Sequence, residues 1–270
     1  MIELNKIYNE DCLDTMARMP DGYIDLTVTS PPYDNLRDYK FENIEKAWNL
    51  EKFKAIAREL YRVTKQGGVV VWVVGDATIN GSETGTSFRQ ALYFKEECGF
   101  NLHDTMIYQK RGTGACGSNL AYWQGFEYMF IFSKEKPTHI KRIADGKNKM
   151  VGLKSPGRFR IGGNKEKKHE TNEMGIRTNI WEYNIGFTDY SDKTNHPAPF
   201  PEALAKDHII SWSNEGALIY DPFMGSGTTA KMAVLLNRKY IGSEISAEYC
   251  RIAEQRLKET KCDLFLHAST

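Results

Sequence analysis

The sequence lacks the features that mark membrane-spanning, secreted and zinc-binding proteins. No stretch of its 270 residues approaches the roughly 20 consecutive apolar residues of a membrane-spanning helix. The first residues, Met1 to Lys6, lack the basic-then-apolar layout of a signal peptide. The five cysteines are an odd number, and no two form a CxxC pair. We therefore expect a cytoplasmic protein with reduced cysteines, no metal site and no membrane contact.

The chain also has little net charge, because 36 basic residues balance 35 acidic residues to +1. This balance conceals a basic segment from Lys134 to Glu170, where nine lysines and three arginines accompany four acidic residues. Its charge is +8, so the rest of the chain carries −7. A basic segment on an acidic body suits a polyanion such as DNA, and it equally suits a solvated lysine-rich loop.

Short apolar runs alternate with amphipathic stretches, the pattern of βα units around a parallel sheet. The run from Val69 to Val74 predicts a strand that is covered on both faces. Further strands are expected at 23–28, 101–109, 126–132, 217–220 and 240–242, and helices at 49–64, 87–98, 202–211, 228–236 and 247–258. From Ser133 to about Asn195 the periodicity fades, which predicts an inserted lobe or a partly disordered loop.

A glycine-rich turn, Asp221-Pro222-Phe223-Met224-Gly225-Ser226-Gly227, links a predicted strand to the helix that begins at Thr228. Glycines let the backbone pass close to a ligand, and a helix N-terminus supplies free N–H groups. Glu244 follows the next strand, where nucleoside-binding folds grip ribose hydroxyls. The turn has neither the lysine of a phosphate-binding loop nor a GxGxxG fingerprint, which favours a nucleoside ligand with a cationic centre. A purely structural turn is the alternative.

A second motif, Thr29-Ser30-Pro31-Pro32-Tyr33, directly follows a predicted strand. Its two prolines remove backbone N–H donors and stiffen the turn, leaving carbonyls as acceptors. The Ser30 hydroxyl and the Pro31 carbonyl can both accept from one amino group, and Tyr33 offers a face on which an extruded base can stack. Such a turn alone is more often structural, or a ligand for another domain. At the carboxyl edge of an α/β sheet it becomes a site candidate.

Together with Glu244, the two motifs resemble the catalytic and cofactor motifs of the amino methyltransferases of DNA. Their order is similar to that of the β group, a circular permutation of the usual order. The resemblance extends from about Ile7 to Leu257, apart from a variable segment. It implies an α/β fold with a doubly wound, mostly parallel, seven-stranded Rossmann-like sheet. The implied divisions are a catalytic half at 1–133, a basic target-recognition region at 134–195 and a cofactor-binding half at 196–270.

The resemblance also implies the site residues. The expected catalytic residues are Ser30, Pro31, Pro32 and Tyr33. S-adenosyl-L-methionine is expected to meet Asp11 and Cys12 at its adenine edge and Glu244 at its ribose, with His196 and Phe200 in the segment that closes over its methionine end. The remaining expected cofactor-binding residues are Asp221, Pro222, Phe223, Gly225, Ser226, Gly227 and Thr228. The strand from Phe126 to Ser133 resembles the one that helps hold the flipped base.

The implied reaction is methyl transfer to an exocyclic amino nitrogen of a base flipped out of double-stranded DNA. Cytosine C5 methylation is disfavoured, because it needs a cysteine nucleophile and none of the five cysteines follows a proline. Ser-Pro-Pro-Tyr resembles the cytosine-N4 enzymes, whereas Asp-Pro-Pro-Tyr is common in adenine-N6 enzymes, so we predict cytosine N4. Adenine N6, RNA methylation and a non-catalytic DNA-binding module are the alternatives. A cognate restriction endonuclease is a possible partner, and both a monomer and a homodimer are open.

Overall fold

The structure is a computed structural model that describes residues 2–32, 48–111, 122–148, 151, 173–184 and 201–268, with side chains to Thr260. The chain forms two compact units. The larger comprises Met1–Lys141 and Asn179–Thr270, and the smaller comprises Arg142–Thr178. The smaller unit contains an antiparallel pair, β8 (Ala144–Lys147) and β9 (Met174–Ile176), and an ion pair between Arg177 and Asp145.

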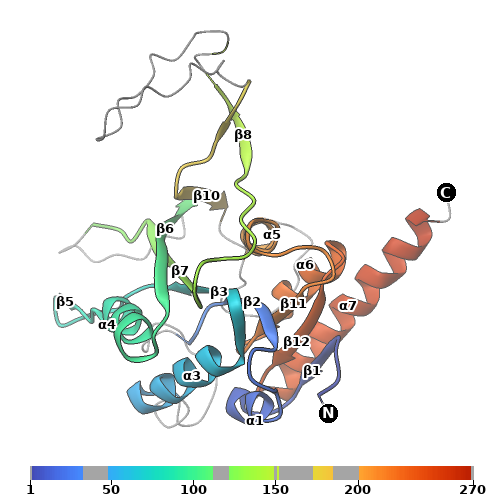
Figure 1. Cartoon of the computed structure of the whole chain (residues 1–270), viewed down its shortest axis with the longest axis horizontal. Coiled ribbons are helices and arrows are strands. Elements are labelled where there is room, and N and C mark those ends of the chain that lie inside the picture. Colours follow the sequence, from blue (N-terminus) through green and yellow to red (C-terminus); the bar gives the residue numbers. More distant parts are fainter. Residues whose placement is uncertain are drawn as a thin grey trace. The chain divides into compact units, whose positions relative to one another are not determined.

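The larger unit is built on an eight-stranded sheet (Figure 1). From one edge to the other its strands are β1 (Lys6–Tyr8), β12 (Lys239–Ser243), β11 (Leu218–Asp221), β2 (Ile24–Thr29), β3 (Thr64–Val74), β7 (Phe126–Ser133), β6 (Asn101–Arg111) and β10 (Ile180–Asn184). Neighbouring strands are parallel except for β7, which is antiparallel to both β3 and β6. The expected mostly parallel methyltransferase-type sheet is confirmed.

The sheet differs from the expected one by having an eighth strand, β10. This strand comes from the segment 134–195 and pairs in parallel with β6. Its burial alternates, with Trp181 and Tyr183 buried and the residues around them exposed. Such a period of two is the pattern of a half-buried strand, but five residues between aperiodic stretches are too few to stand out in the sequence.

The helices cover the two faces of the sheet. In chain order they are α1 (Cys12–Ala17), α3 (Leu50–Val63), α4 (Thr86–Leu92), a π-helical turn (Tyr93–Glu97), α5 (Glu202–Trp212), α6 (Thr228–Leu235) and α7 (Ala247–Ala268). A two-stranded hairpin, β4 (Thr78–Ile79) and β5 (Ser82–Glu83), precedes α4. Contacts join α1 to α3 and α3 to the π-helical turn, and on the other face α5 to α6 and α6 to α7 (Figure 1). None of the described helices is long and apolar enough to cross a membrane.

Three expected boundaries are wrong by more than two residues. The expected strand at 69–74 begins at Thr64, the expected helix at 87–98 gives way to the π-helical turn at Tyr93, and the expected helix at 247–258 continues to Ala268. The early start of β3 accompanies a register irregularity against β2 between Ile24 and Leu26. The two glycines at 67–68 are therefore accommodated inside a strand and do not begin it, because the sheet ladder overrides their local preference.

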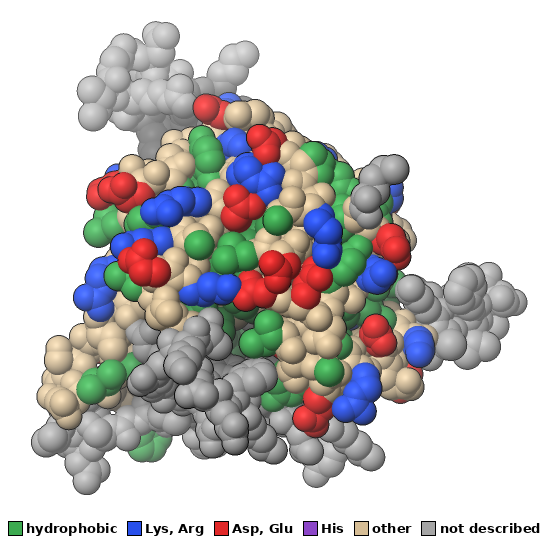
Figure 2. All heavy atoms as spheres, turned by 90° about the horizontal axis from the view of Figure 1, so that it is seen from below, with side chains coloured by type: hydrophobic (Ala, Val, Ile, Leu, Met, Phe, Trp, Pro, Cys, Tyr) green, Lys and Arg blue, Asp and Glu red, His purple; other side chains and the backbone are tan. Residues whose placement is uncertain are grey.

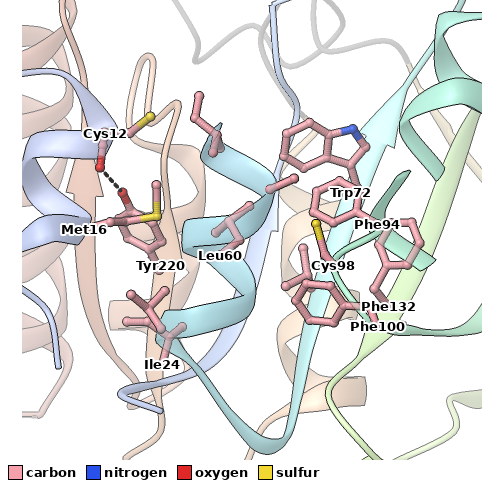
Figure 3. Packing of buried hydrophobic residues seen from close by; sticks show 14 of the residues in the cluster. Cys12, Met16, Ile24, Leu60, Trp72, Phe94, Cys98, Phe100, Phe132 and Tyr220 are labelled. Atoms are coloured by element: carbon pink, nitrogen blue, oxygen red, sulfur yellow. Dashed lines mark hydrogen bonds between the residues drawn. The ribbon is translucent and has the colours of Figure 1, made fainter. Parts of the chain in front are cut away.

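One cluster of buried hydrophobic residues extends from β11 past Leu60 of α3 to β3 and β7 (Figure 3). Near β3, β6 and β7, the Phe94 ring lies with its centroid 5.1 Å from that of Trp72 and 4.7 Å from that of Phe132. Near β11, Met16 and Tyr220 are fully buried. Burying each such large side chain stabilises the fold by about 1.5–3 kcal/mol. These contacts fix the strands whose ends carry the two sequence motifs.

The face seen in Figure 2 carries intermixed basic and acidic side chains. Ion pairs in and near α1 and α3 include Arg62 with Glu59 and Lys52 with Asp11. At 0.1 M salt, interactions between exposed charges more than about 10 Å apart are largely screened. These charges therefore act mainly on their immediate neighbours.

A buried histidine links α5 to the far strands. Trp212 Nε1 donates to His208 Nδ1 at 3.2 Å, so the ring proton is on Nε2, which lies 3.2 Å from Met129 Sδ. The ring centroid of Trp181 is 4.7 Å away. Burial lowers the pKa of His208 from 6.5 to about 3. The histidine is therefore neutral in the folded protein at neutral pH.

We expect His208 to destabilise the protein in acid. Below pH 6.5 the unfolded chain binds a proton at this residue, whereas the folded protein binds it only near pH 3. The stability due to neutral His208 is thus complete above pH 6.5 and is lost as the pH falls. The free energy of unfolding should fall by about 1.4 kcal/mol per pH unit relative to that of His208→Leu. Urea unfolding between pH 4.5 and 7.5 measures this difference. An equal slope in the wild type and in His208→Leu would contradict the effect of the buried, neutral imidazole.

Candidate functional site

The two motifs meet at the point where the winding of the sheet reverses. β2 and β11 are adjacent and parallel, with Ile219 opposite Leu26 and Tyr220 opposite Thr27. From β2 the chain passes through α3 to β3 on one side, and from β11 it passes through α6 to β12 on the other. In open α/β sheets this switch point, at the carboxyl ends of the strands, is where ligands bind.

The glycine-rich turn takes a conformation that requires its glycines. Gly225 and Gly227 have φ angles of 52° and 85°, in the left-handed region. A Cβ on Gly227 would lie 2.7 Å from the Cβ of Ala253, so α7 packs directly against the turn. Arg256, also on α7, donates to the carbonyl oxygen of Ser226 at 2.7 Å and to its hydroxyl at 2.9 Å. The packing of Ala253 and the hydrogen bonds of Arg256, both on α7, therefore hold the turn in its conformation.

Glu244 is fastened by backbone amides at the end of β12. Gly225 N donates to its Oε2 and Ser246 N donates to its Oε1, both at 2.8 Å. The side chain of Asn9 donates to the Glu244 carbonyl at 2.9 Å. Burial raises the pKa of Glu244, while its bonds from the amides act in the opposite direction. Each carboxylate oxygen has two lone pairs, so each can accept a further hydrogen bond from a ligand hydroxyl.

Asp221 is the second buried carboxylate of the site. Its Oδ1 accepts from the Thr29 hydroxyl at 2.6 Å and from Phe223 N at 3.0 Å. Burial raises its pKa to about 6, because desolvation disfavours the charged form. The charge of Asp221 also raises the pKa of Glu244, because the two carboxylates repel each other. A cationic ligand would relieve this repulsion, so the site favours positive charge.

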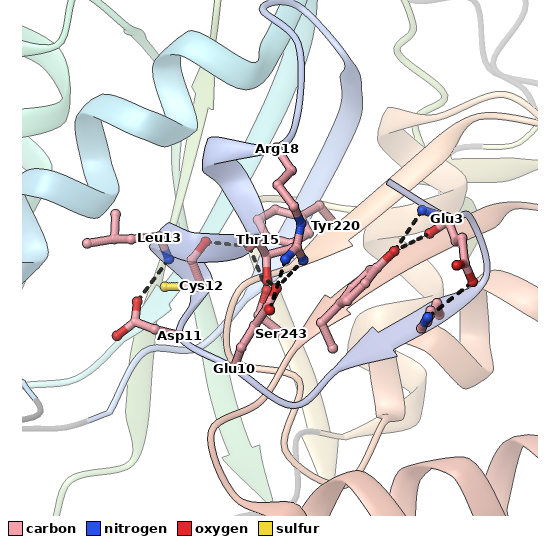
Figure 4. Close-up of polar contacts among 11 residues, drawn as sticks. Glu3, Glu10, Asp11, Cys12, Leu13, Thr15, Arg18, Tyr220 and Ser243 are labelled. Atoms are coloured by element: carbon pink, nitrogen blue, oxygen red, sulfur yellow. Dashed lines mark hydrogen bonds and ion pairs between the residues drawn. The ribbon is translucent and has the colours of Figure 1, made fainter. Parts of the chain in front are cut away.

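The N-terminal segment completes this side of the site (Figure 4). Asp11 caps α1, accepting from Leu13 N at 2.9 Å, and its other oxygen pairs with Lys52. The carbonyl of Cys12 accepts from the Tyr220 hydroxyl at 3.5 Å. Burial raises the pKa of the Cys12 thiol to about 12, so it stays protonated and is no nucleophile.

The turn that carries Ser30, Pro31 and Pro32 begins where β2 ends. Pro31 is buried, and Ser30 and Pro32 are half-buried. The predicted site residues Tyr33, His196 and Phe200 lie outside the described residues. Among the residues that the structure describes, no group of three or more His, Cys, Asp or Glu side chains could hold a metal ion.

The structure adds residues that sequence reasoning missed. Trp48 places its ring edge-on to Phe223, with 5.3 Å between centroids, and Lys52 pairs with Asp11. Trp48 lies two residues before α3 and Lys52 lies in its first turn, so the N-terminal end of α3 borders the glycine-rich turn. Thr29 stands in the Thr29-Ser30-Pro31-Pro32-Tyr33 motif and Asn9 lies two residues before Asp11, but the sequence indicates no partner for either. The contact of each joins residues about 190 positions or more apart, so no local spacing could reveal it.

Comparison with known families decides the family. A family model described as DNA methylase matches residues 24–255. The chain belongs to the DNA methylase family. It is a DNA methyltransferase of the type that modifies amino groups at N6 or N4.

Individual family members cover nearly the whole chain. The orphan methyltransferase M.BamHII of Bacillus amyloliquefaciens is 59% identical over 247 residues, which are 88% of this chain and 90% of that protein. The DNA adenine methyltransferase YhdJ of Escherichia coli (strain K12) is 25% identical over 260 residues, 94% of this chain and 83% of that protein. The solved PvuII DNA methyltransferase (cytosine-N4-specific) is alike in fold, with a TM-score of 0.69 at 21% identity, covering 93% of this chain and 85% of that one.

We expect Gly227→Ala to destabilise the protein more than Gly216→Ala does. Both glycines have positive φ, at 85° and 78°, so a side chain costs about 1 kcal/mol of backbone strain at either position. The alanine at 227 would also clash with Ala253, whereas at 216 no described residue beyond the two chain neighbours lies within 4 Å of the Cβ position. Overpacking should lower the free energy of unfolding of Gly227→Ala by a further 1–3 kcal/mol or so. Urea unfolding of both variants provides the test, and equal losses would contradict the packing described for α7.

Proposed function

We propose that this family member transfers a methyl group from S-adenosyl-L-methionine to the N4 amino group of cytosine, in a base flipped out of double-stranded DNA. The observation that carries the proposal is the meeting of two turns at the switch point of the sheet. One is the turn at 30–32, and the other is the glycine-rich turn from Asp221 to Gly227. The first offers acceptors for an amino group, and the second offers carboxylates for a cationic nucleoside.

The residues present fit S-adenosyl-L-methionine, the methyl donor of this family. When bound, it supplies a methyl group on a positively charged sulfur. Asp221 and Glu244 are buried carboxylates with raised pKa values, so a cation would stabilise their ionised forms. Glu244 would accept from the ribose hydroxyls, Asp221 and the turn that follows it would surround the methionine end, and Asp11 would lie at the adenine edge. The rings of Phe223 and Trp48 would add cation–π or stacking contacts.

On the acceptor side, Ser30 and Pro31 would orient the amino group of the base. The nitrogen lone pair is delocalised into the ring, so the amino group is a poor nucleophile. Hydrogen bonds from the amino group to the Ser30 hydroxyl and the Pro31 carbonyl would direct the lone pair toward the methyl group. Such positioning can supply several kcal/mol of the barrier reduction. Tyr33 would stack on the flipped base, with Pro32 stiffening the turn.

The preference for cytosine rests on the first residue of the acceptor motif. Ser30 resembles the serine of cytosine-N4 enzymes, and the PvuII enzyme with the same fold is cytosine-N4-specific. Adenine N6 is the second candidate, because the relative YhdJ is an adenine methyltransferase.

Target recognition is proposed for residues 134–195. This region contains the basic segment with charge +8, which would hold phosphates, while a smaller set of side chains reads base edges. Binding to DNA should therefore weaken steeply with salt. A cognate restriction endonuclease and a monomeric or dimeric state stay predictions.

Nucleoside analysis of methylated DNA tests the function. Purified protein, tritiated S-adenosyl-L-methionine and genomic DNA should give labelled DNA that contains N4-methylcytosine after digestion and mass spectrometry. N6-methyladenine in its place would establish the second candidate. Absence of transfer to any DNA would contradict both.

We expect Ser30→Ala to lower turnover while leaving donor binding intact. Loss of one hydrogen bond that orients the reacting group should lower kcat about 10- to 100-fold. The Kd for S-adenosyl-L-methionine, measured by calorimetry, should stay near the wild-type value. Ser82→Ala, on the exposed β4–β5 hairpin, is the matched control and should leave kcat unchanged. If Ser30→Ala abolished donor binding, Ser30 would belong to the donor site and not to the acceptor site.

A further inference from the structure

A buried hydrogen bond joins the residue before the turn at 30–32, here called the acceptor turn, to the first residue of the glycine-rich turn, here called the donor turn. Thr29 is the last residue of β2 and directly precedes Ser30, and Asp221 is the last residue of β11. The Thr29 hydroxyl donates to Asp221 Oδ1 at 2.6 Å. Thr29 and Asp221 are 1% and 5% exposed, so water cannot easily replace either partner. Hydrogen bonds to charged groups are among the stronger ones in proteins.

A second hydroxyl strengthens this connection from α6. The single hydroxyl proton of Thr229 can be donated either to the carbonyl oxygen of Val28, 3.3 Å from Oγ1, or to the Asp221 carboxylate, whose raised pKa it counteracts. The first turn of α6 is thereby tied to β2, one residue before Thr29. Two threonines therefore fasten the strand of the acceptor motif to the carboxylate and helix of the donor motif.

We propose that Thr29 is a positioning residue that holds the Asp221 carboxylate ionised and in register with the Ser30 turn, and so sets the spacing between methyl donor and acceptor. The inference rests on the proposed function, because it presumes that Asp221 faces the donor. It assigns to Thr29 a role that is separate from contact with either substrate.

The electrostatics of Asp221 support this role. Burial raises its pKa to about 6, and the bond from Thr29 counteracts that rise. The other titratable groups that interact with it are Glu244, from the end of β12, and Tyr220, from β11. From β2 and α6 the contacts are threonine hydroxyls. Removing the Thr29 hydroxyl should therefore raise the pKa of Asp221 further, and weaken binding of a cationic donor first at low pH.

The test compares donor affinity with pH in three variants. Thr29→Val removes the hydroxyl and keeps the shape, Thr29→Ser keeps the hydroxyl, and Thr27→Val is the control. Thr27 lies on the same face of β2 two residues earlier, and its buried hydroxyl has no hydrogen-bond partner among the described residues. Calorimetry with S-adenosyl-L-methionine from pH 5.5 to 8.5 should show affinity rising with pH. In Thr29→Val this rise should move up by about one pH unit, the size expected for one charge-assisted hydrogen bond.

Thr29→Ser and Thr27→Val should keep the wild-type curve. The kcat of Thr29→Val should also fall at saturating donor, because the Ser30 turn loses its anchor. In an Asp221→Asn background, Thr29→Val should no longer move the pH curve, since no carboxylate titrates there.

A loss of donor affinity that is equal at every pH would overturn the proposal, as would an unshifted curve for Thr29→Val. Failure of Thr29→Val to fold would assign Thr29 to stability alone and would also overturn it. Failure of the proposed function is separate: it would show as absent methyl transfer by the wild type, whatever the pH curves of donor binding.

Discussion

The parallel pairing of β2 with β11 is the constraint on which the rest of the site depends. It brings together residues that are 192 positions apart, such as Thr29 and Asp221. Because the chain leaves the two strands toward opposite sides, the turns that follow them share one edge of the sheet. Any shift in this register would move the Ser30 turn relative to the glycine-rich turn. The core cluster that contains Trp72 of β3 and Tyr220 of β11 buries side chains of the strands at this point of the sheet.

Burial of two carboxylates gives the site its chemical preference. Asp221 and Glu244 lose hydration, and backbone amides and a threonine hydroxyl replace only part of it. Their raised pKa values record that imbalance. The folded protein thus holds an unfavourable arrangement that a positively charged ligand would improve. The buried carboxylates lower the stability of the folded protein at the position where a ligand would bind, as is common at functional sites.

Much of this architecture could be predicted from the sequence. The β-branched run at 69–74 and the glycine-rich turn identified strands of a mostly parallel sheet, and the order of the two motifs implied the permuted family. β1 and β10 escaped prediction because three and five residues carry too little periodicity. The π-helical turn depends on packing of Phe94 against the sheet, which no local pattern encodes.

Within the site, the motifs named the residues but not their partners. The pairs formed by Lys52 with Asp11 and by Trp48 with Phe223 arise from the approach of α3, which is set by the whole fold. The contact of Thr29 with Asp221 follows from sheet register in the same way. Local sequence specifies turns and strands, whereas the contacts between distant segments follow only from their assembly.

The position of β1 at the edge of the sheet has a consequence for the order of assembly during synthesis. β1 pairs with β12, and Asn9 donates to Glu244, so residues of the N-terminal segment complete a site whose other half is made 235 residues later. Until β11 and β12 leave the ribosome, the edges of β1 and β2 that face them have no partner strand. Unpaired edges of this kind invite association with other chains. The nascent chain therefore exposes these strand edges until the strands that pair with them have been synthesised.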